Sequence, residues 1–175
     1  MYMQFRLPRF QSLLLAGSVL IASNSLADTF SYDQGALPDA KPWTAAEFQN
    51  KPEEFQFVVI GDRTGGANQE QTFKLAIDQL NLLQPEFVIN VGDTIEGYSD
   101  DKAELNAEWD EVDAMLAELD MPFFRVPGNH DIANKVAQEV WRERHGATYY
   151  HFVYNDTLFL VLDSEDPPRE APEGI

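Results

Sequence analysis

The sequence contains no cysteine, only three histidines and few basic residues. Without cysteine no disulfide holds the fold together, and an oxidising compartment does the chain no harm. Lys and Arg number 12 against 30 Asp and Glu, which gives a net charge of −18 at pH 7. A body this acidic repels nucleic acid and anionic membrane surfaces, so we expect neither as a partner.

The apolar run near the start, Leu13–Ala22, is much shorter than the ~20 residues that span a bilayer, which argues against a stable membrane anchor. Arg6 and Arg9 precede it without any acidic residue, and small residues follow at Ser25 and Ala27. This layout is typical of a secretory signal peptide, so we predict cleavage after Ala27 and a periplasmic or secreted protein. Removing residues 1–27, which hold two basic and no acidic residues, changes the net charge from −18 to −20.

The remaining chain reads as an irregular lead-in (28–52), one domain (53–166) and an acidic, proline-rich end (167–175). Short runs rich in β-branched and aromatic residues predict strands, and apolar residues at helical spacing predict helices between them. We expect strands within 55–62, 87–93 and 122–128, helices over 72–83, 105–119 (capped by Ser99 or Asp100) and 136–144, and a hairpin turning at Asn155-Asp156 within 148–166. Consecutive βαβ units predict an α/β fold, with a βαβαβ parallel core sheet followed by an antiparallel hairpin.

Each predicted parallel strand ends in a glycine followed by a polar side chain that suits a metal: Gly61-Asp62, Gly92-Asp93 and Gly128-Asn129. Ligand crevices of open α/β sheets lie beyond the carboxyl ends of the strands, so Asp62, Asp93 and Asn129 should converge there. Two carboxylates and an amide oxygen at one place favour a divalent cation, and a pair of metals would also supply positive potential on this acidic body. The alternative is that each Asp merely caps a turn after its strand.

The third turn continues as Asn129-His130-Asp131. The amide oxygen of Asn129 suits a metal, while His130 would project toward a substrate as an acid or a stabiliser of charge. Asp131 would accept a hydrogen bond from the other imidazole nitrogen and fix the tautomer.

The segments "GDRTGG", "GDTIEG" and "GNHD" resemble the first three motifs of the calcineurin-like metallophosphoesterases, over roughly Phe55 to Glu165. The resemblance implies the first half of an α/β/β/α sandwich and hydrolysis of phosphate esters by metal-activated water at a two-metal centre, with Mn, Fe or Zn as the metals. It implies that Asp62 ligates the first metal, Asp93 bridges both and Asn129 ligates the second. His130 would be the acid or charge-stabilising histidine and Asp131 its partner.

The sequence departs from the family pattern in two places. Thr64 stands where the family usually has a histidine in its first motif, although some branches also lack that histidine. The later histidine motifs of the family are missing, so the chain resembles the N-terminal part of a longer protein. A non-catalytic remnant that binds metal weakly or not at all is therefore the alternative function. Strands left uncovered in this way would expose an apolar face and promote self-association.

Four further polar residues need an interpretation. Glu96 matches the acidic position of the second motif without being a predicted ligand. Arg63 is a candidate substrate-phosphate ligand, or else a loop arginine on an acidic surface. His145 ends a predicted helix, where a cation suits the dipole. His151 lies in a strand, and we expect it to pack or hydrogen-bond locally.

Overall fold

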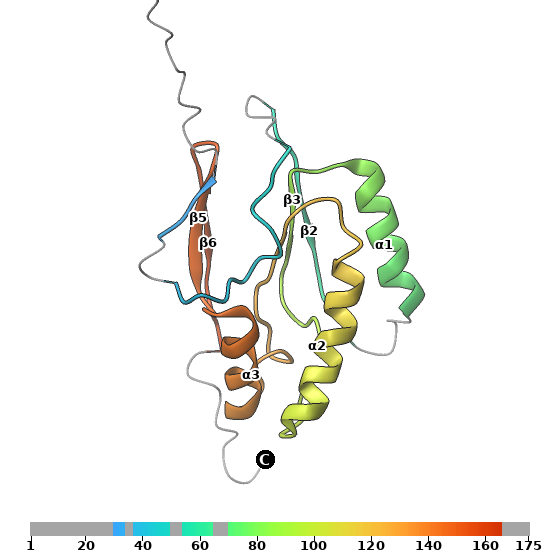
Figure 1. Cartoon of the computed structure of the whole chain (residues 1–175), viewed down its shortest axis with the longest axis vertical. Coiled ribbons are helices and arrows are strands. Elements are labelled where there is room, and N and C mark those ends of the chain that lie inside the picture. Colours follow the sequence, from blue (N-terminus) through green and yellow to red (C-terminus); the bar gives the residue numbers. More distant parts are fainter. Residues whose placement is uncertain (1–29, 34–36, 50–53, 65–69, 166–175) are drawn as a thin grey trace, which may run out of the picture.

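The computed structural model describes residues 30–33, 37–49, 54–64 and 70–165. The predicted signal peptide (1–27) and the acidic end (167–175) lie outside these residues. The elements, drawn in Figure 1, are β1 (Phe30–Ser31), β2 (Phe57–Ile60), α1 (Glu70–Leu83), β3 (Phe87–Asn90), α2 (Lys102–Leu116), β4 (Phe123–Phe124), α3 (Lys135–His145), β5 (Tyr150–Tyr154) and β6 (Thr157–Val161). No helix in the described part of the chain is long and apolar enough to cross a membrane.

Two three-stranded sheets form the framework, and they confirm the predicted α/β fold. Strands β2, β3 and β4 pair in parallel in that order, and β1, β5 and β6 pair antiparallel. Helices α1 and α2 cover the face of the parallel sheet that points away from the antiparallel sheet (Figure 1). The parallel sheet is thus the middle layer, as the resemblance to half of a sandwich implies.

The helix-side core contains the apolar stripes that the sequence predicts. Phe73, Ile77 and Leu80 of α1 are buried there, together with four residues of α2: Leu105, Trp109, Val112 and Leu116. The cap of α2 differs from the prediction, because Asp101, and not Ser99 or Asp100, accepts a hydrogen bond from the N–H of Ala103 at 2.7 Å. The hydroxyl of Ser99 instead accepts from the N–H of Asp101, so the cap lies one or two residues later than predicted.

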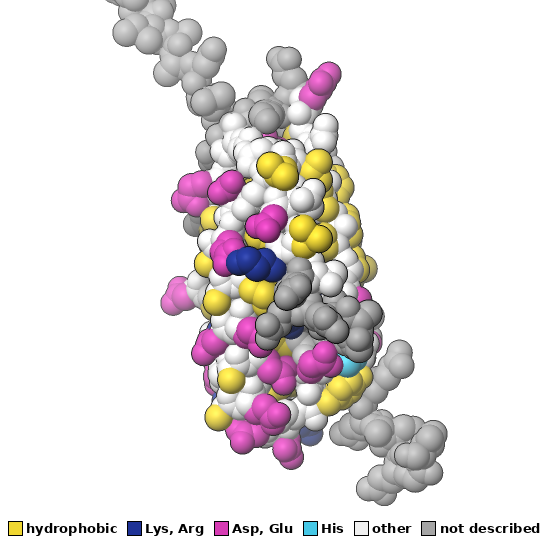
Figure 2. All heavy atoms as spheres, turned by 90° about the vertical axis from the view of Figure 1, so that its right-hand side faces the viewer, with side chains coloured by type: hydrophobic (Ala, Val, Ile, Leu, Met, Phe, Trp, Pro, Cys, Tyr) yellow, Lys and Arg dark blue, Asp and Glu magenta, His cyan; other side chains and the backbone are white. Residues whose placement is uncertain are grey.

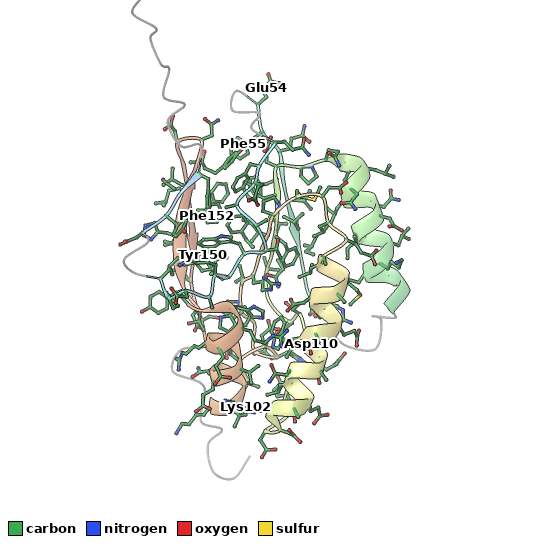
Figure 3. The ribbon with its side chains drawn as sticks, viewed as in Figure 1. Glu54, Phe55, Lys102, Asp110, Tyr150 and Phe152 are labelled. Carbon is green, nitrogen blue, oxygen red and sulfur yellow. The ribbon has the colours of Figure 1, made fainter. Side chains whose placement is uncertain are left out.

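Aromatic side chains fill the space between the two sheets. Phe152 stacks on Phe124 of the parallel sheet with ring centroids 4.2 Å apart, and on Phe159 of its own sheet at 4.8 Å. Figure 3 shows Tyr150 and Phe152 pointing from the antiparallel sheet toward the parallel sheet. The hairpin that supplies them turns at Asn155 and Asp156, as predicted. Both have positive φ (45° and 62°), which matches the twist of the flanking strands.

The lead-in, predicted to be irregular, takes part in this core. Phe30 and Ser31 form β1 against β5, and Trp43 makes a bridge to Phe124. Trp43 is buried between the sheets, and Phe48 packs against the same cluster. The partners of these residues lie far away in the sequence, so no local periodicity marks them. The lead-in is therefore part of the folded domain and does not merely precede it.

One side of the two-sheet arrangement leaves apolar side chains in contact with solvent. Strands β2 and β6 are edge strands, and the ring centroids of Phe57 and Phe159 lie 5.2 Å apart between them. Leu158, Leu160 and Leu162 are 60%, 63% and 68% exposed. The expected uncovered apolar face is thus present along β6.

Candidate functional site

The three motif loops meet at the carboxyl ends of the parallel strands. The first loop contacts the second through the N–H of Arg63, which donates to the carbonyl of Asp93 at 2.9 Å. The second contacts the third through the carboxylate of Asp93, whose Oδ1 accepts from the backbone N–H of His130 at 3.0 Å. The convergence of the three loops, predicted from strand order alone, is therefore present in the fold.

Glycines allow this close approach. Gly92 has φ +97°, and a Cβ there would lie 2.6 Å from the Cα of Gly128. A Cβ on Gly128 would collide with the backbone nitrogen and the carboxylate of Asp93. Asp93 itself has φ +52°, a conformation that non-glycine residues adopt rarely and often at functional sites. The backbone is thus strained at the residue that the family resemblance assigns as the bridging ligand.

Asp131 connects the second and third loops through hydrogen bonds to the backbone of both. Its side chain is fully buried, and Oδ1 accepts from the N–H groups of Thr94 (2.8 Å) and Ile95 (3.2 Å). Oδ2 accepts from the N–H of Gly128 at 2.8 Å. Burial raises the pKa of Asp131 to about 6, against the opposing effect of these three amides. The carboxylate of Asp131 therefore positions the backbone of these two loops. The sequence predicts a contact with the imidazole of His130 instead, and that contact is not made.

The imidazole of His130 has a different partner. Its Nδ1 lies 2.6 Å from the carbonyl oxygen of Glu96. A carbonyl oxygen only accepts hydrogen bonds, so Nδ1 carries the proton and donates. Nε2 is then the nitrogen left to face a ligand. The partner of Nδ1 is thus a backbone carbonyl of the second loop, where the sequence predicts Asp131.

The two remaining predicted ligands are exposed. Oδ1 of Asp62 accepts from both the N–H and the hydroxyl of Thr64, each at 3.0 Å, so one of its oxygens caps the turn. The side-chain amide of Asn129 donates to the hydroxyl of Tyr98 at 2.6 Å. Thr64, at the position of the missing family histidine, thus turns its hydroxyl to the carboxylate of Asp62.

The donor set suits a hard cation. The second oxygen of Asp62, that of Asp93 and the amide oxygen of Asn129 accept no hydrogen bond from the described residues. Oxygen ligands of this kind fit Mg²⁺ or Mn²⁺ better than softer metals. Over the described ranges, no group of three or more His, Cys, Asp or Glu side chains lies close enough to hold a metal ion. The described residues of the three loops therefore offer two carboxylates and one amide as candidate oxygen donors.

The side chain of Arg63 makes its contacts within the domain. It donates to the carbonyl of Thr94 at 3.2 Å and to the carboxylate of Glu111 at 2.5 Å, and it lies over the ring of Phe73. Its side chain is 15% exposed. These contacts explain Arg63 as a loop arginine, and a contact with substrate stays a prediction.

The other two histidines lie elsewhere. His145 is buried against Trp109 and Trp141, with ring centroids 4.5 and 5.0 Å away. Burial lowers its pKa to about 2, helped by the nearby cations Arg125 and Arg144, so it is neutral and does not act as the expected cation at the helix end. His151 is exposed on β5 and lines a cavity of about 540 Å³ that no motif residue lines.

Two supporting contacts were not predicted from the sequence. Asn90, buried at the end of β3, donates to the hydroxyl of Thr94 and accepts from the N–H of Val126, both at 2.7 Å. It thus connects the second loop to the segment that leads into the third. The sequence signal for Asn90 is a single amide side chain at the end of an apolar strand. A buried amide needs hydrogen-bond partners, so such a residue indicates a structural contact.

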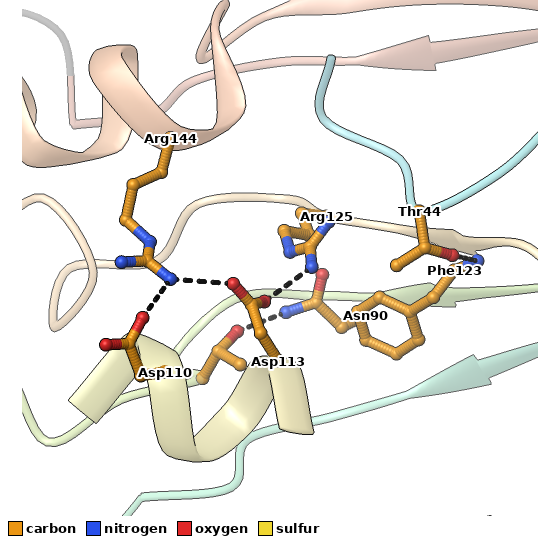
Figure 4. Close-up of polar contacts among 8 residues, drawn as sticks. Thr44, Asn90, Asp110, Asp113, Phe123, Arg125 and Arg144 are labelled. Carbon is orange, nitrogen blue, oxygen red and sulfur yellow. Dashed lines mark hydrogen bonds and ion pairs between the residues drawn. The ribbon is translucent and has the colours of Figure 1, made fainter. Parts of the chain in front are cut away.

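A chain of charges fixes the same segment from the helix side. Arg125, 7% exposed, donates to Asp113 at 2.7 Å, and Asp113 accepts from Arg144 at 2.8 Å, which also contacts Asp110 (Figure 4). Burial lowers the pKa of Arg125, while Asp113 opposes that effect. The network links α2 and α3 to the residue three positions before Gly128.

The family model for calcineurin-like phosphoesterases matches residues 55–168, which is more than half of the chain. Comparisons with curated proteins and with solved structures found no match. The matched region contains all three loops and the sheet that brings them together. This chain therefore belongs to the calcineurin-like phosphoesterase family.

Proposed function

We propose that this protein is an exported, metal-dependent hydrolase of phosphate esters that uses a two-metal centre. The observation that carries the proposal is Asp93, which contacts the first loop through its carbonyl and the third through its carboxylate. Asp62, Asp93 and Asn129 would hold the metals, which when bound supply activated water and positive charge. Figure 2 shows many acidic and few basic side chains on one face, so bound cations would provide the attraction for a phosphate.

His130 is the proton donor in this proposal. Because Nδ1 donates to the Glu96 carbonyl, Nε2 is the atom that exchanges a proton with the substrate. In its protonated form Nε2 donates to the ester oxygen as the bond to phosphorus breaks, so the alcohol leaves neutral. Asp131 and Asn90 keep the loops in register while this occurs.

The test uses the protein without residues 1–27, assayed with Mn²⁺ on p-nitrophenyl phosphate and its bis ester. Asp93→Asn keeps an oxygen for the His130 N–H and tolerates positive φ, but it loses the charge. We expect a fall in kcat/KM of at least about a hundredfold, since a metal ligand contributes several kcal/mol. Asp100→Asn, an exposed change in the same loop, is the control. Full activity in Asp93→Asn would remove the proposal.

Export is a separate part of the proposal and rests on the layout of residues 1–27. N-terminal sequencing of the protein from a bacterial host tests it. A first residue of Asp28 in the periplasmic fraction supports cleavage after Ala27. An intact Met1 in the cytoplasmic fraction contradicts it.

The second candidate function is a non-catalytic remnant, and the Thr64 hydroxyl bonded to Asp62 is the observation that favours it. A hydroxyl is a weaker ligand than the imidazole usual at this position, so the first metal site would be incomplete. Calorimetric titration with Mn²⁺ separates the two candidates. Two tight sites refute the remnant, and an absence of binding together with an absence of hydrolysis refutes the enzyme.

A further inference from the structure

Residues 96–98, at the end of the second motif loop, lie against Asn129 and His130. The Glu96 carbonyl accepts from Nδ1 of His130, and the ring of Tyr98 meets the imidazole edge to face with centroids 4.5 Å apart. The Tyr98 hydroxyl accepts from the side-chain amide of Asn129. Gly97 lies between them, where a Cβ would collide with the carbonyl of His130. Glu96 and Tyr98 thus contact the two side chains that the proposed reaction needs from the third motif, and Gly97 between them packs closely on the backbone of His130.

The contact with Asn129 holds its side-chain amide in one orientation, with Nδ2 on the Tyr98 hydroxyl. An amide has a donor side and an acceptor side, and a hydrogen bond to one side fixes the direction of the other. Because Nδ2 donates to the Tyr98 hydroxyl at 2.6 Å, Oδ1 is left for a cation. Without that hydroxyl the exposed amide of Asn129 would lose this contact and would be able to rotate.

The contact with His130 limits the imidazole in a second way. The hydrogen bond to Glu96 fixes one ring nitrogen, but the ring can still pivot about that bond. The Tyr98 ring at 4.5 Å blocks that motion on one side. Aromatic pairs in edge-to-face geometry attract each other, so this contact also favours one orientation.

The backbone of the loop is held in a costly conformation. Gly97 and Tyr98 have φ +60° and +58°, and a tyrosine adopts positive φ rarely. The N–H of Gly97 donates to the carboxylate of Glu108 on α2 at 2.9 Å, which anchors the loop to the domain. Tyr98 is nevertheless 63% exposed, so burial of its ring does not explain the strain. The contacts with Asn129 and His130 are the interactions that the strained residue makes.

We propose that Tyr98 is a positioning residue that orients the amide oxygen of Asn129 toward the metal and holds the imidazole of His130 in place. The role rests on the proposed function, because it concerns the ligand and the proton donor of that same site. Tyr98 acts through its hydroxyl on Asn129 and through its ring on His130. The two effects are separable, since Tyr98→Phe removes the first and Tyr98→Leu removes both.

The experiment compares these variants with Tyr149→Phe, because Tyr149 is also 63% exposed but lies beside β5, on the cavity of about 540 Å³ that no motif residue lines. The first readout is the Asn129 side-chain amide signal in ¹H–¹⁵N NMR spectra of the metal-free protein, assigned by its loss in Asn129→Asp. The second is the affinity for Mn²⁺ alone, measured by calorimetry. Circular dichroism confirms that each variant is folded.

We expect Tyr98→Phe to move the Asn129 amide signal to the position of a free amide and to weaken Mn²⁺ binding about tenfold, as loss of an outer contact to a ligand does. Tyr98→Leu should in addition change the ring-proton shifts of His130, while Tyr149→Phe changes none of these. An unmoved amide signal in Tyr98→Phe overturns the inference. If the unmodified protein binds no Mn²⁺ and hydrolyses neither ester, the proposed function fails, and the amide signal still decides the role of Tyr98.

Discussion

The carboxylate of Asp93 accepts a hydrogen bond from the backbone N–H of His130, across two loops that are 37 residues apart in the chain. The contact is possible only because position 128 has no side chain, since a Cβ there would occupy the place of the Asp93 carboxylate. The absence of a side chain at Gly128 therefore determines whether Asp93 and His130, the predicted metal ligand and the proposed proton donor, lie side by side.

Gly128→Ala tests this relationship. We expect the variant to lose about 2 kcal/mol of unfolding free energy, because the added methyl overpacks a backbone contact, and to lose Mn²⁺ binding. Gly61→Ala is the matched control, since a Cβ there would meet only the side chain of Val91 at 3.8 Å. Urea denaturation and calorimetry measure both effects. Equal stability of the two variants would show that the loops do not approach each other as described.

The charge network predicts unequal effects of two neighbouring acids on α2. Asp113→Ala leaves the buried guanidinium of Arg125 without its carboxylate, which should cost about 3 kcal/mol of unfolding free energy. Asp110→Ala removes a carboxylate that is 72% exposed and should cost less than about 1 kcal/mol. Denaturant titration of both variants at the same ionic strength checks this. A larger loss of unfolding free energy in Asp110→Ala than in Asp113→Ala would contradict the argument from burial.

His145 should make the protein sensitive to acid. Its pKa is lowered to about 2 in the fold, mainly by burial, while an unfolded histidine titrates near 6.5. Protons therefore bind the unfolded state first, so the stabilisation is complete above pH 6.5 and is lost as pH falls from there toward 2. Between pH 7.5 and 5.0 the loss should be about 2 kcal/mol.

His145→Phe fills the same place between Trp109 and Trp141 without a titratable group. We expect its unfolding free energy to fall by about 2 kcal/mol less than that of the unmodified protein over the same pH range. Thermal and urea unfolding at pH 7.5 and 5.0 give the comparison. Identical pH dependence in both proteins would rule out His145 as the source.

The exposed leucines of β6 predict self-association. An edge strand with apolar side chains and no charge within Thr157–Leu162 offers unpaired backbone groups to a second copy. Leu160→Lys places a charge on that edge, and we expect it to reduce the sedimentation coefficient at high concentration to that of a monomer. Leu82→Lys alters a leucine that is 77% exposed but lies on helix α1. Association that is lost equally in both variants would exclude edge pairing as the cause.

The sequence predicted the elements that depend on local pattern. Phe73, Ile77 and Leu80 recur at helical spacing and are buried together on α1. The turn at Asn155-Asp156 depends on residues that tolerate positive φ, which composition reveals. The meeting of the loops that begin at Asp62, Asp93 and Asn129 also followed from sequence, because strand order and direction determine where carboxyl ends lie.

The sequence did not predict contacts whose partners are chosen by tertiary structure. Asp131 was expected to contact its neighbour His130, yet its carboxylate binds amides of Thr94 and Ile95, more than 35 residues away. The sequence indicates no function for Tyr98, because an exposed aromatic residue in a loop belongs to no hydrophobic periodicity and to no known motif. A buried N–H group bonds to an acceptor that is close in space, and the sequence does not show which acceptor that is before the loops are placed in the fold.

The pairing of β1 with β5 has a consequence for biosynthesis. Phe30 leaves the ribosome long before Tyr154, the residue it pairs with, so β1 cannot pair until the hairpin has been made. The aromatic cluster around Trp43 also includes Tyr150 and Phe152, so it is complete only after the same hairpin has been made. Chains whose contacts join distant positions in the sequence fold slowly and expose hydrophobic surface until folding is complete. We therefore expect the nascent protein to bind a holding chaperone until translation has passed β6.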